Sequence, residues 1–428
     1  MSKIDRGEIL KFGTYLLTDG LNKALPFLIL PVFAYFINPE EFGVMTNFNV
    51  LLQFALPLVS LGTFTYLTVE YFNVEKNKVS VLYTSLVVLI FVLFLLSIII
   101  VVIFQGLIFR LVALELKWQL CATFCAFLSA CINLFLSYLR VIGKSLFFGV
   151  LQIFQSLILA VVSISLVAFL EIGWEAKAIG TFLSVLATFV LFAFYGFHNR
   201  LLSFHDCRLY QIKNAVNFGL PLLPHNISFW LRSGADKIVV THFLGLSMNG
   251  VYSIALSFGT IVTLFTTSFF NVYSPYIYKQ LSDIEKGVVD KNVILRQHLK
   301  YILIFAFTLM VLVCLLYCLL YFLVPLIFKG DYVNSLKYTP LVLLAVYFNS
   351  LYSIFSMYIF YKKETKKLGF ITFLSTILQV IMIYFCCSVF GIIGVLISSV
   401  IISILIFVLT AMLANKYYSF VRFRSSAK

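Results

Sequence analysis

The sequence predicts an all-α polytopic membrane protein in which about twelve helices cross the bilayer. Of its 428 residues, 62% are hydrophobic and only 11% are charged, and the mean hydropathy is +1.04. A soluble domain has roughly 45–50% apolar and about 25% charged residues, and a single core could not bury this much apolar surface. Helices that face lipid need no polar covering. The composition therefore indicates a multi-pass membrane protein.

Apolar runs long enough for a spanning helix, about 20 residues, recur along the whole chain. The first run is followed by Pro39-Glu40-Glu41 rather than by a small-residue cleavage site, so we interpret it as a spanning helix and not as a signal peptide. The seventh run carries the most polar residues. The predicted spans are 11–37, 44–70, 80–104, 118–139, 146–170, 178–197, 214–243, 250–277, 301–327, 338–361, 368–388 and 391–414.

Lysine and arginine residues are distributed between alternate loops in the way that sets membrane orientation. With a cytoplasmic N-terminus, 23 of the 31 basic residues lie in inside segments, 5 lie in outside loops and 3 lie within spans. Such an excess on one side is the positive-inside pattern. We therefore expect both termini on the cytoplasmic side. The same pattern explains the net charge of +14 without nucleic-acid binding.

Two short sequence patterns recur half a chain length apart. Residues 11–13 resemble residues 217–219 at an offset of 206, and residues 42–46 resemble residues 249–253 at an offset of 207. With six predicted spans in each half, the repeat predicts two parallel six-helix lobes around a central cavity. Parallel repeats of this kind are an arrangement found in transporters, with the substrate path between the halves.

The expected domain division follows from this repeat. Helices 1–6 form an N-terminal lobe at 1–197, a cytoplasmic linker occupies 198–213, and helices 7–12 form a C-terminal lobe at 214–428.

Charged side chains within two of the predicted spans are the strongest candidates for a functional site. A charge at mid-bilayer costs at least ~2.5–3.5 kcal/mol on insertion scales, so it is normally buried against protein or a water-filled cavity. The first and seventh spans both carry polar residues at i, i+3 or i+4, and i+7, which places them on one helix face. The candidate substrate-binding residues are Asp19, Asn22, Lys23, His225, Asn226, Trp230, Arg232, Asp236 and Lys237.

Two interpretations of these charges remain open. In the first, Asp19–Lys23 and Arg232–Asp236 are i, i+4 ion pairs that neutralise each other and fix helix packing. In the second, the residues line a cationic cavity that holds an anionic headgroup, and the carboxylates tune the cations or carry a coupling proton. Lys237 favours the second interpretation, because the sequence shows no obvious partner for it within its own helix.

Sequence motifs for catalysis, metal binding or cofactors are not found in this chain. Gly143-Lys144-Ser145 lacks the glycine that a phosphate-binding loop carries five residues earlier, where this chain has Tyr138. No cysteine–histidine spacing fits zinc, and no loop is long enough to fold into a catalytic domain. We therefore expect no catalytic residues, no metal site and no cofactor, and a protein that is not an enzyme.

Four segments carry motifs whose order and spacing point to a known family. Residues 36–43 look like the pattern L-x-P-E-x-[FY]-G, and residues 326–332 are similar to an FG-x-x-Y turn. Residues 139–144 fit the loop after the fourth helix, and residues 217–257 fit the start of the second half. Together they resemble the polysaccharide-transport branch of the multidrug/oligosaccharidyl-lipid/polysaccharide (MOP) exporter superfamily, most closely its O-antigen flippases.

The resemblance implies a specific activity. The substrate would be an undecaprenyl-diphosphate-linked oligosaccharide, a repeat unit of O-antigen or a similar surface polysaccharide, moved from the cytoplasmic to the periplasmic leaflet of a bacterial inner membrane. An ion gradient, of protons or sodium, would drive alternating access. Membrane lipids, and the polymerase and chain-length regulator of the same pathway, would be partners. Asp236 and Lys237 would line the cavity.

Other functions predict different sequence features. A drug/cation antiporter of the same superfamily should favour an acidic cavity, whereas the mid-span charges here are three basic and two acidic. A polysaccharide polymerase or ligase should place a large loop or domain outside the membrane, and the predicted spans leave room for none.

Overall fold

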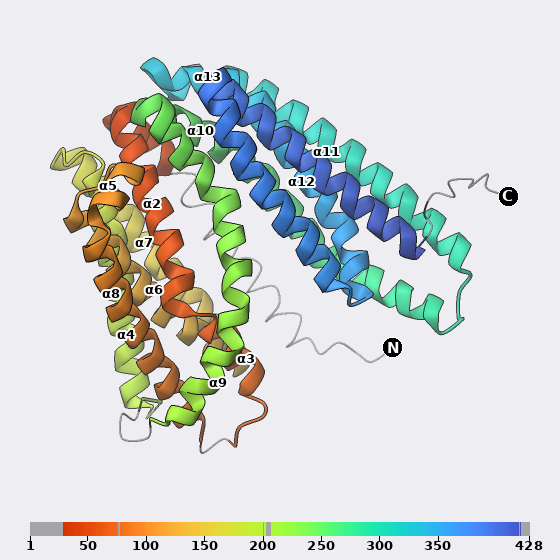
Figure 1. Ribbon diagram of the computed structural model, residues 1–428, viewed down its shortest axis with the longest axis horizontal. Helices are drawn as coiled ribbons and strands as arrows, with labels where there is room; N and C mark the ends of the chain where they lie inside the picture. Colours follow the sequence, from red (N-terminus) through yellow and green to blue (C-terminus); the bar gives the residue numbers. More distant parts are fainter. Residues whose placement is uncertain (1–28, 76–77, 200, 203–206, 419, 421–428) are drawn as a thin grey trace. The chain divides into compact units, whose positions relative to one another are not determined.

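The computed structural model describes residues 29–75, 78–199, 201–202, 207–418 and 420, and every regular element in these ranges is a helix. The chain divides into two compact units, Met1–Gly250 and Val251–Lys428. Each unit is a bundle of long helices (Figure 1). The all-α membrane fold predicted from composition is confirmed. The predicted lobe boundary near 198–213 stays a prediction.

After a helical stretch at 29–36, the described residues of the first unit form a series of helical elements. They are α2 (Pro39–Ser60), α3 (Thr63–Glu70), α4 (Val79–Ile103), α5 (Gln105–Val112), α6 (Leu116–Val141), α7 (Ser145–Phe169), α8 (Glu175–His198), α9 (Leu209–Gly219), the 3-10 turn η3 (Leu220–Leu222) and the first part of α10 (Leu223–Glu285). The second unit contains the rest of α10, α11 (Lys291–Ile327), η4 (Gly330–Asn334), α12 (Ser335–Tyr361) and α13 (Thr365–Tyr418).

The helix count agrees with about twelve spans. Nine helices among the described residues are long and apolar enough to cross a membrane. Two of them, α10 and α13, are broken at Gly245 (φ 85°) and Gly391 (φ 61°), where a positive φ interrupts the helix, so each contains two spans. The predicted first span lies mostly outside the described residues, which show it as helix only from residue 29 to 36.

Two predicted spans differ from the structure in their details. The span 44–70 begins earlier, at Pro39, because Asn38 and Glu41 form a capping box, and it is interrupted after Ser60 by left-handed backbone at Leu61 and Gly62. The span 214–243 is divided by η3, which contains Pro221. Proline has no N–H to continue an α-helix, which accounts for the 3-10 turn at this point.

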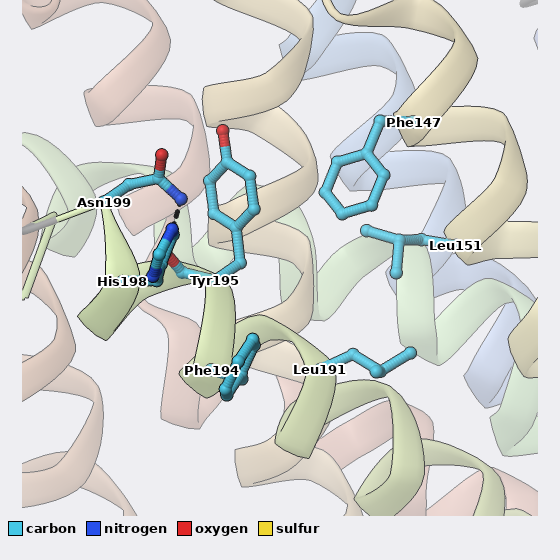
Figure 2. A pocket seen from close by; sticks show the side chains of 7 residues that line it. All are labelled: Phe147, Leu151, Leu191, Phe194, Tyr195, His198 and Asn199. Atoms are coloured by element: carbon cyan, nitrogen blue, oxygen red, sulfur yellow. Dashed lines mark hydrogen bonds between the residues drawn. The ribbon is translucent and has the colours of Figure 1, made fainter.

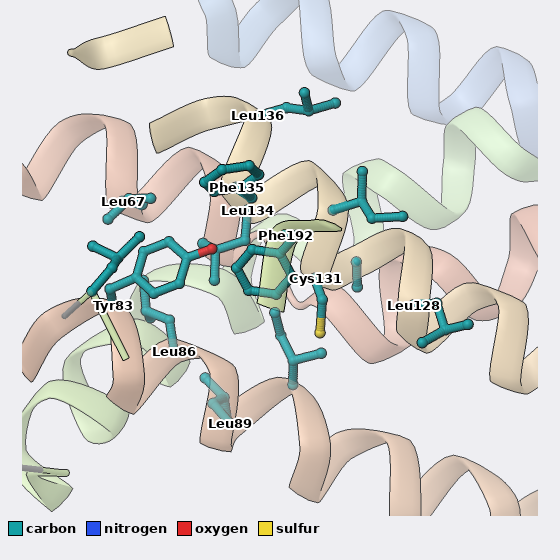
Figure 3. Close-up of a cluster of buried hydrophobic side chains, with 14 of the residues drawn as sticks. Leu67, Tyr83, Leu86, Leu89, Leu128, Cys131, Leu134, Phe135, Leu136 and Phe192 are labelled. Carbon is teal, nitrogen blue, oxygen red and sulfur yellow. The ribbon is translucent and has the colours of Figure 1, made fainter. Parts of the chain in front are cut away.

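Aromatic and aliphatic side chains fill the core of the first unit between α4, α6 and α8 (Figure 3). Phe192 lies 6.2 Å from the ring of Tyr83 and 5.0 Å from that of Phe135, measured between ring centroids. By contrast, α11 leaves Phe307, Phe322 and Leu326 more than two-thirds exposed. Such a surface suits lipid and not water, which supports a multi-pass membrane protein.

Candidate functional site

The candidate site lies on the part of α10 that precedes the break at Gly245. Arg232, Asp236 and Lys237 lie 8 to 13 residues before this glycine. At 1.5 Å per residue, they are about 12–20 Å along the helix from the break. The hydrocarbon core is about 30 Å thick. These charges therefore fall in the middle of a span that ends at Gly245.

Asp236 and Lys237 form a local ion pair. Asp236 is only 6% exposed, and its Oδ1 accepts a hydrogen bond from the backbone N–H of Lys237 at 2.9 Å. The Lys237 Nζ lies 3.6 Å from the same oxygen and also donates to the carbonyl of Ser233, one turn earlier. The expectation that Lys237 has no partner in its own helix is therefore wrong. The flexible lysine stem folds back along the helix, which the i, i+4 spacing rule does not anticipate.

Arg232 and Asn226 are half-buried on the same helix. Arg232 and Lys237 against Asp236 give this segment a net charge of +1. The backbone of His225 is helical, and its side chain lies outside what the structure describes. The segment therefore combines one buried carboxylate with two cations in the middle of a span.

Trp230 attaches this segment to α2. Its indole Nε1 donates to the carbonyl of Val50 at 2.9 Å, and its ring lies 4.5 Å from that of Phe54. The absence of a side chain at Gly234 makes room, because a Cβ there would lie 3.1 Å from the indole nitrogen. Since the indole N–H already has an acceptor, only the ring surface of Trp230 is left for a substrate. Its role in substrate binding stays a prediction.

A buried amide network next to this segment was not predicted from the sequence. Asn47 of α2 is fully buried, and its Nδ2 donates to the carbonyl of Val112 at 2.9 Å and to Thr241 Oγ1 at 3.2 Å. Its Oδ1 accepts from Asn249 Nδ2 at 2.9 Å. The network joins α2 and α5 to α10 on both sides of Gly245. The available sequence pattern was an asparagine within each of two otherwise apolar stretches.

Gly43 and Gly250, which are equivalent in the sequence repeat, pack against each other's helix. A Cβ at Gly43 would lie 2.1 Å from the carbonyl oxygen of Leu246, and one at Gly250 would lie 2.0 Å from that of Pro39. Leu246 precedes Gly250 by four residues, just as Pro39 precedes Gly43 by four residues. The repeat between residues 42–46 and 249–253 therefore extends to a reciprocal contact in three dimensions, within the first unit.

The other candidate residues, Asp19, Asn22 and Lys23, lie outside the described residues. Whether they face the charged part of α10 stays a prediction. Among the described residues, no group of three histidine, cysteine or acidic side chains is placed to hold a metal ion.

Comparisons with known proteins give the class of this chain. A solved structure of a multidrug resistance MATE family transporter of the MOP superfamily, in an inward-facing conformation, is similar with a TM-score of 0.68 and 16% sequence identity, and the match covers 95% of this chain and 96% of that one. A MOP superfamily transporter from Pyrococcus furiosus, described by the reverse polarity of its binding pocket, has a TM-score of 0.57 at 15% identity and 95% coverage of each chain. The fold is that of MOP superfamily transporters.

The family follows from the sequence comparison. The model of the polysaccharide biosynthesis protein family matches residues 10–280, and the chain belongs to this family. The "Lsg locus putative protein 1" of Haemophilus influenzae is 22% identical over 382 residues, which cover 86% of this chain and 88% of that protein. The predicted relationship to polysaccharide-transport proteins is supported, because the chain belongs to the polysaccharide biosynthesis protein family and has the fold of MOP superfamily transporters. The protein is a multi-pass membrane protein.

Proposed function

We propose that this protein is a flippase for a lipid-linked oligosaccharide. The substrate is an undecaprenyl-diphosphate-linked repeat unit of O-antigen or a similar surface polysaccharide. The protein moves it from the cytoplasmic to the periplasmic leaflet of a bacterial inner membrane. Alternating access between two six-helix lobes, 1–197 and 214–428, joined by the linker 198–213, exposes the site to one leaflet at a time. An ion gradient of protons or sodium drives the cycle.

The observation that carries this proposal is the charge in the middle of α10. A diphosphate carries negative charge, and burying it in hydrocarbon without partners has a prohibitive cost. Arg232 can bind phosphate oxygens with two parallel hydrogen bonds, and Lys237 adds a second cation within reach of the same helix face. Asp236 holds Lys237 in place. Asp19, Asn22, Lys23, His225, Asn226 and Trp230 complete the proposed substrate-binding set.

Two comparisons support the choice of an anionic substrate. The family description concerns polysaccharide biosynthesis, in which membrane-bound intermediates must cross the bilayer. Among proteins of this fold, the one from Pyrococcus furiosus is described as having a binding pocket of reverse polarity that suggests a different function. The net charge of +1 on the part of α10 that precedes Gly245 favours a lipid diphosphate over a cationic drug. The polymerase and chain-length regulator of the polysaccharide pathway are the proposed protein partners.

The test is complementation in the organism that carries the gene. After deletion, the surface polysaccharide should disappear, and single lipid-linked repeat units should accumulate on the cytoplasmic leaflet. A plasmid copy of the wild-type gene should restore the polysaccharide. Normal polysaccharide after deletion, or unpolymerised repeat units that reach the periplasm, would contradict the proposal.

A matched pair of arginine variants connects this test to the site. Arg232→Gln removes the mid-span cation, whereas Arg296→Gln removes an exposed arginine near the start of α11. We expect only Arg232→Gln to abolish complementation, with both proteins present in the membrane at wild-type levels. If Arg232→Gln protein is lost from the membrane instead, Arg232 serves helix packing and not the substrate.

A further inference from the structure

An apolar groove lies between α7 and α8, away from the charged part of α10. It has a volume of about 180 Å³, and it is lined by Phe147, Leu151, Leu191, Phe194, Tyr195, His198 and Asn199 (Figure 2). Phe194 is 74% exposed and Leu191 is 41% exposed. The groove is therefore open toward the surroundings of the bundle, which are lipid for these two spans. Phe147, Phe194 and Tyr195 contribute aromatic rings to its walls, and the polar side chains of His198 and Asn199 lie together at one end (Figure 2).

A lysine stands at the polar end of this groove. Lys144, in the turn between α6 and α7, donates from Nζ to the hydroxyl of Tyr195 at 2.8 Å, and its Nζ lies 5.3 Å from the centroid of that ring. Lys144 itself is exposed. In the described part of the chain, its Nζ forms no ion pair with a carboxylate. The groove thus has an apolar body with a cation at its mouth.

The second unit contains an equivalent corner, the turn between α12 and α13, which differs from the turn between α6 and α7 in its charged side chains. The turns at 142–144 and 362–364 are alike: Gly143 and Lys363 have φ of 75° and 60°, and the next residue donates its N–H five residues back in both cases. Counted from this turn, Glu364 stands in the place of Lys144.

In the second unit, the glutamate of this turn is paired with a lysine three residues later. Lys367 Nζ lies 3.0 Å from Glu364 Oε1 and donates to the Tyr417 hydroxyl at 2.8 Å. The hydrogen bond from Lys367 lowers the pKa of Glu364, so this carboxylate stays ionised. In the first unit, an apolar side chain, Phe147, stands in the place of Lys367, and it lines the groove. The turn between α6 and α7 thus has a lysine and a phenylalanine where the second unit has a glutamate and a lysine.

We propose that the groove between α7 and α8 binds an anionic phospholipid, with an acyl chain along the apolar walls and the phosphate at Lys144. The lipid phosphate pairs with Lys144 in the way that Glu364 pairs with Lys367 in the second unit. Lys144 lies in a loop that the positive-inside pattern assigns to the cytoplasmic side, where the anionic lipids of a membrane attract clustered basic residues. Basic pockets between membrane helices on that side are typical sites for acidic headgroups.

The experiment measures lipid binding by the purified full-length protein with native mass spectrometry, with phosphatidylglycerol and phosphatidylethanolamine of the same acyl chains as probes. We expect phosphatidylglycerol to bind about fivefold more tightly, which is the preference that one lysine near the headgroups provides. Lys144→Gln should remove this preference. The control Lys366→Gln, which changes an exposed lysine at the other corner, should keep it.

A second variant tests the apolar wall. Leu191→Trp, at an exposed position, should fill the groove and weaken binding of both lipids without affecting folding. Equal binding of the two lipids by the wild-type protein, or an unchanged preference in Lys144→Gln, would overturn the proposal. Displacement of phosphatidylglycerol by equimolar undecaprenyl phosphate would also overturn it, because the groove would then belong to the transported lipid. No glycan is needed, so the result is independent of the complementation test.

Discussion

The two segments of α10, before and after Gly245, are both long and apolar but differ in charge. The first carries Arg232, Asp236 and Lys237 near its middle. The second, from Leu246 onward, has no charged residue before Lys279. Most of its polar residues are threonines and serines, and most of these bond to carbonyls of their own helix, as Thr266 does to Val262 at 2.8 Å. A span in this protein therefore folds without internal charges.

This difference indicates what the charges of the first segment are for. Placing charges at mid-bilayer has a cost that the second segment avoids entirely. Contacts with α2 do not need them either, because the first segment is attached to α2 by the neutral groups of Trp230 and Thr241. Packing alone thus gives little reason to keep Arg232 and Lys237, and binding of an anionic group gives a sufficient one.

The largest effect should come from neutralising a cation of the first segment. Lys237→Gln should lower polysaccharide export more than tenfold, because the diphosphate loses a charge contact where no water replaces it. Lys279→Gln, at the first charge of the second segment, should leave export unchanged, since that lysine is exposed. Export is measured as surface polysaccharide per amount of protein in the membrane. Equal effects of the two variants would remove the functional distinction between the segments.

A methyl group at the close crossing with α2 should have the next largest effect. In Gly43→Ala, the new Cβ would lie 2.1 Å from the carbonyl oxygen of Leu246, so the two backbones must separate. We expect the free energy of unfolding to fall by about 2–3 kcal/mol, which is typical when an extra methyl group is forced into a tightly packed contact. The measurement is denaturant unfolding of the purified protein in one detergent.

The control for this variant is a glycine with open space around it. No atom lies within 4 Å of a Cβ built at Gly106, in α5. Gly106→Ala should therefore keep or slightly raise stability, because alanine loses less backbone entropy in a helix. If both variants have the same stability, the reciprocal contact of Gly43 and Gly250 is looser than the structure shows.

Removing the buried amide at Asn47 should have a smaller effect. Asn47→Leu removes the donor to the carbonyl of Val112 and the acceptor that lies 2.9 Å from Asn249 Nδ2, and an unsatisfied buried group costs about 1–3 kcal/mol, partly recovered by relaxation. We expect a net loss of about 2 kcal/mol in the same unfolding measurement. Asn49→Ala is the control, since the Asn49 amide bonds only to Met45 of its own helix, and it should change stability by less than about 0.5 kcal/mol.

The sequence predicted the fold better than the site, for physical reasons. Long apolar runs specify spans directly, and even the early start of α2 was readable from Asn38 and Glu41, which form a capping box. The contact of Trp230 with Val50 joins residues 180 positions apart, and no local pattern contains it. The pairing of Lys237 with Asp236 depends on how a flexible side chain folds back, which spacing rules do not describe.

The smallest effect should separate two roles of Trp230. Trp230→Phe keeps a ring next to Phe54 but loses the hydrogen bond to Val50, so stability should fall by only about 1 kcal/mol. If Trp230 serves only to attach α10 to α2, export per amount of membrane protein should stay near the wild-type level. If its ring stacks on a sugar, phenylalanine should conserve most of export and Trp230→Leu should lose it at similar stability. A loss of export in Trp230→Phe alone would assign the indole N–H to the substrate and not to Val50.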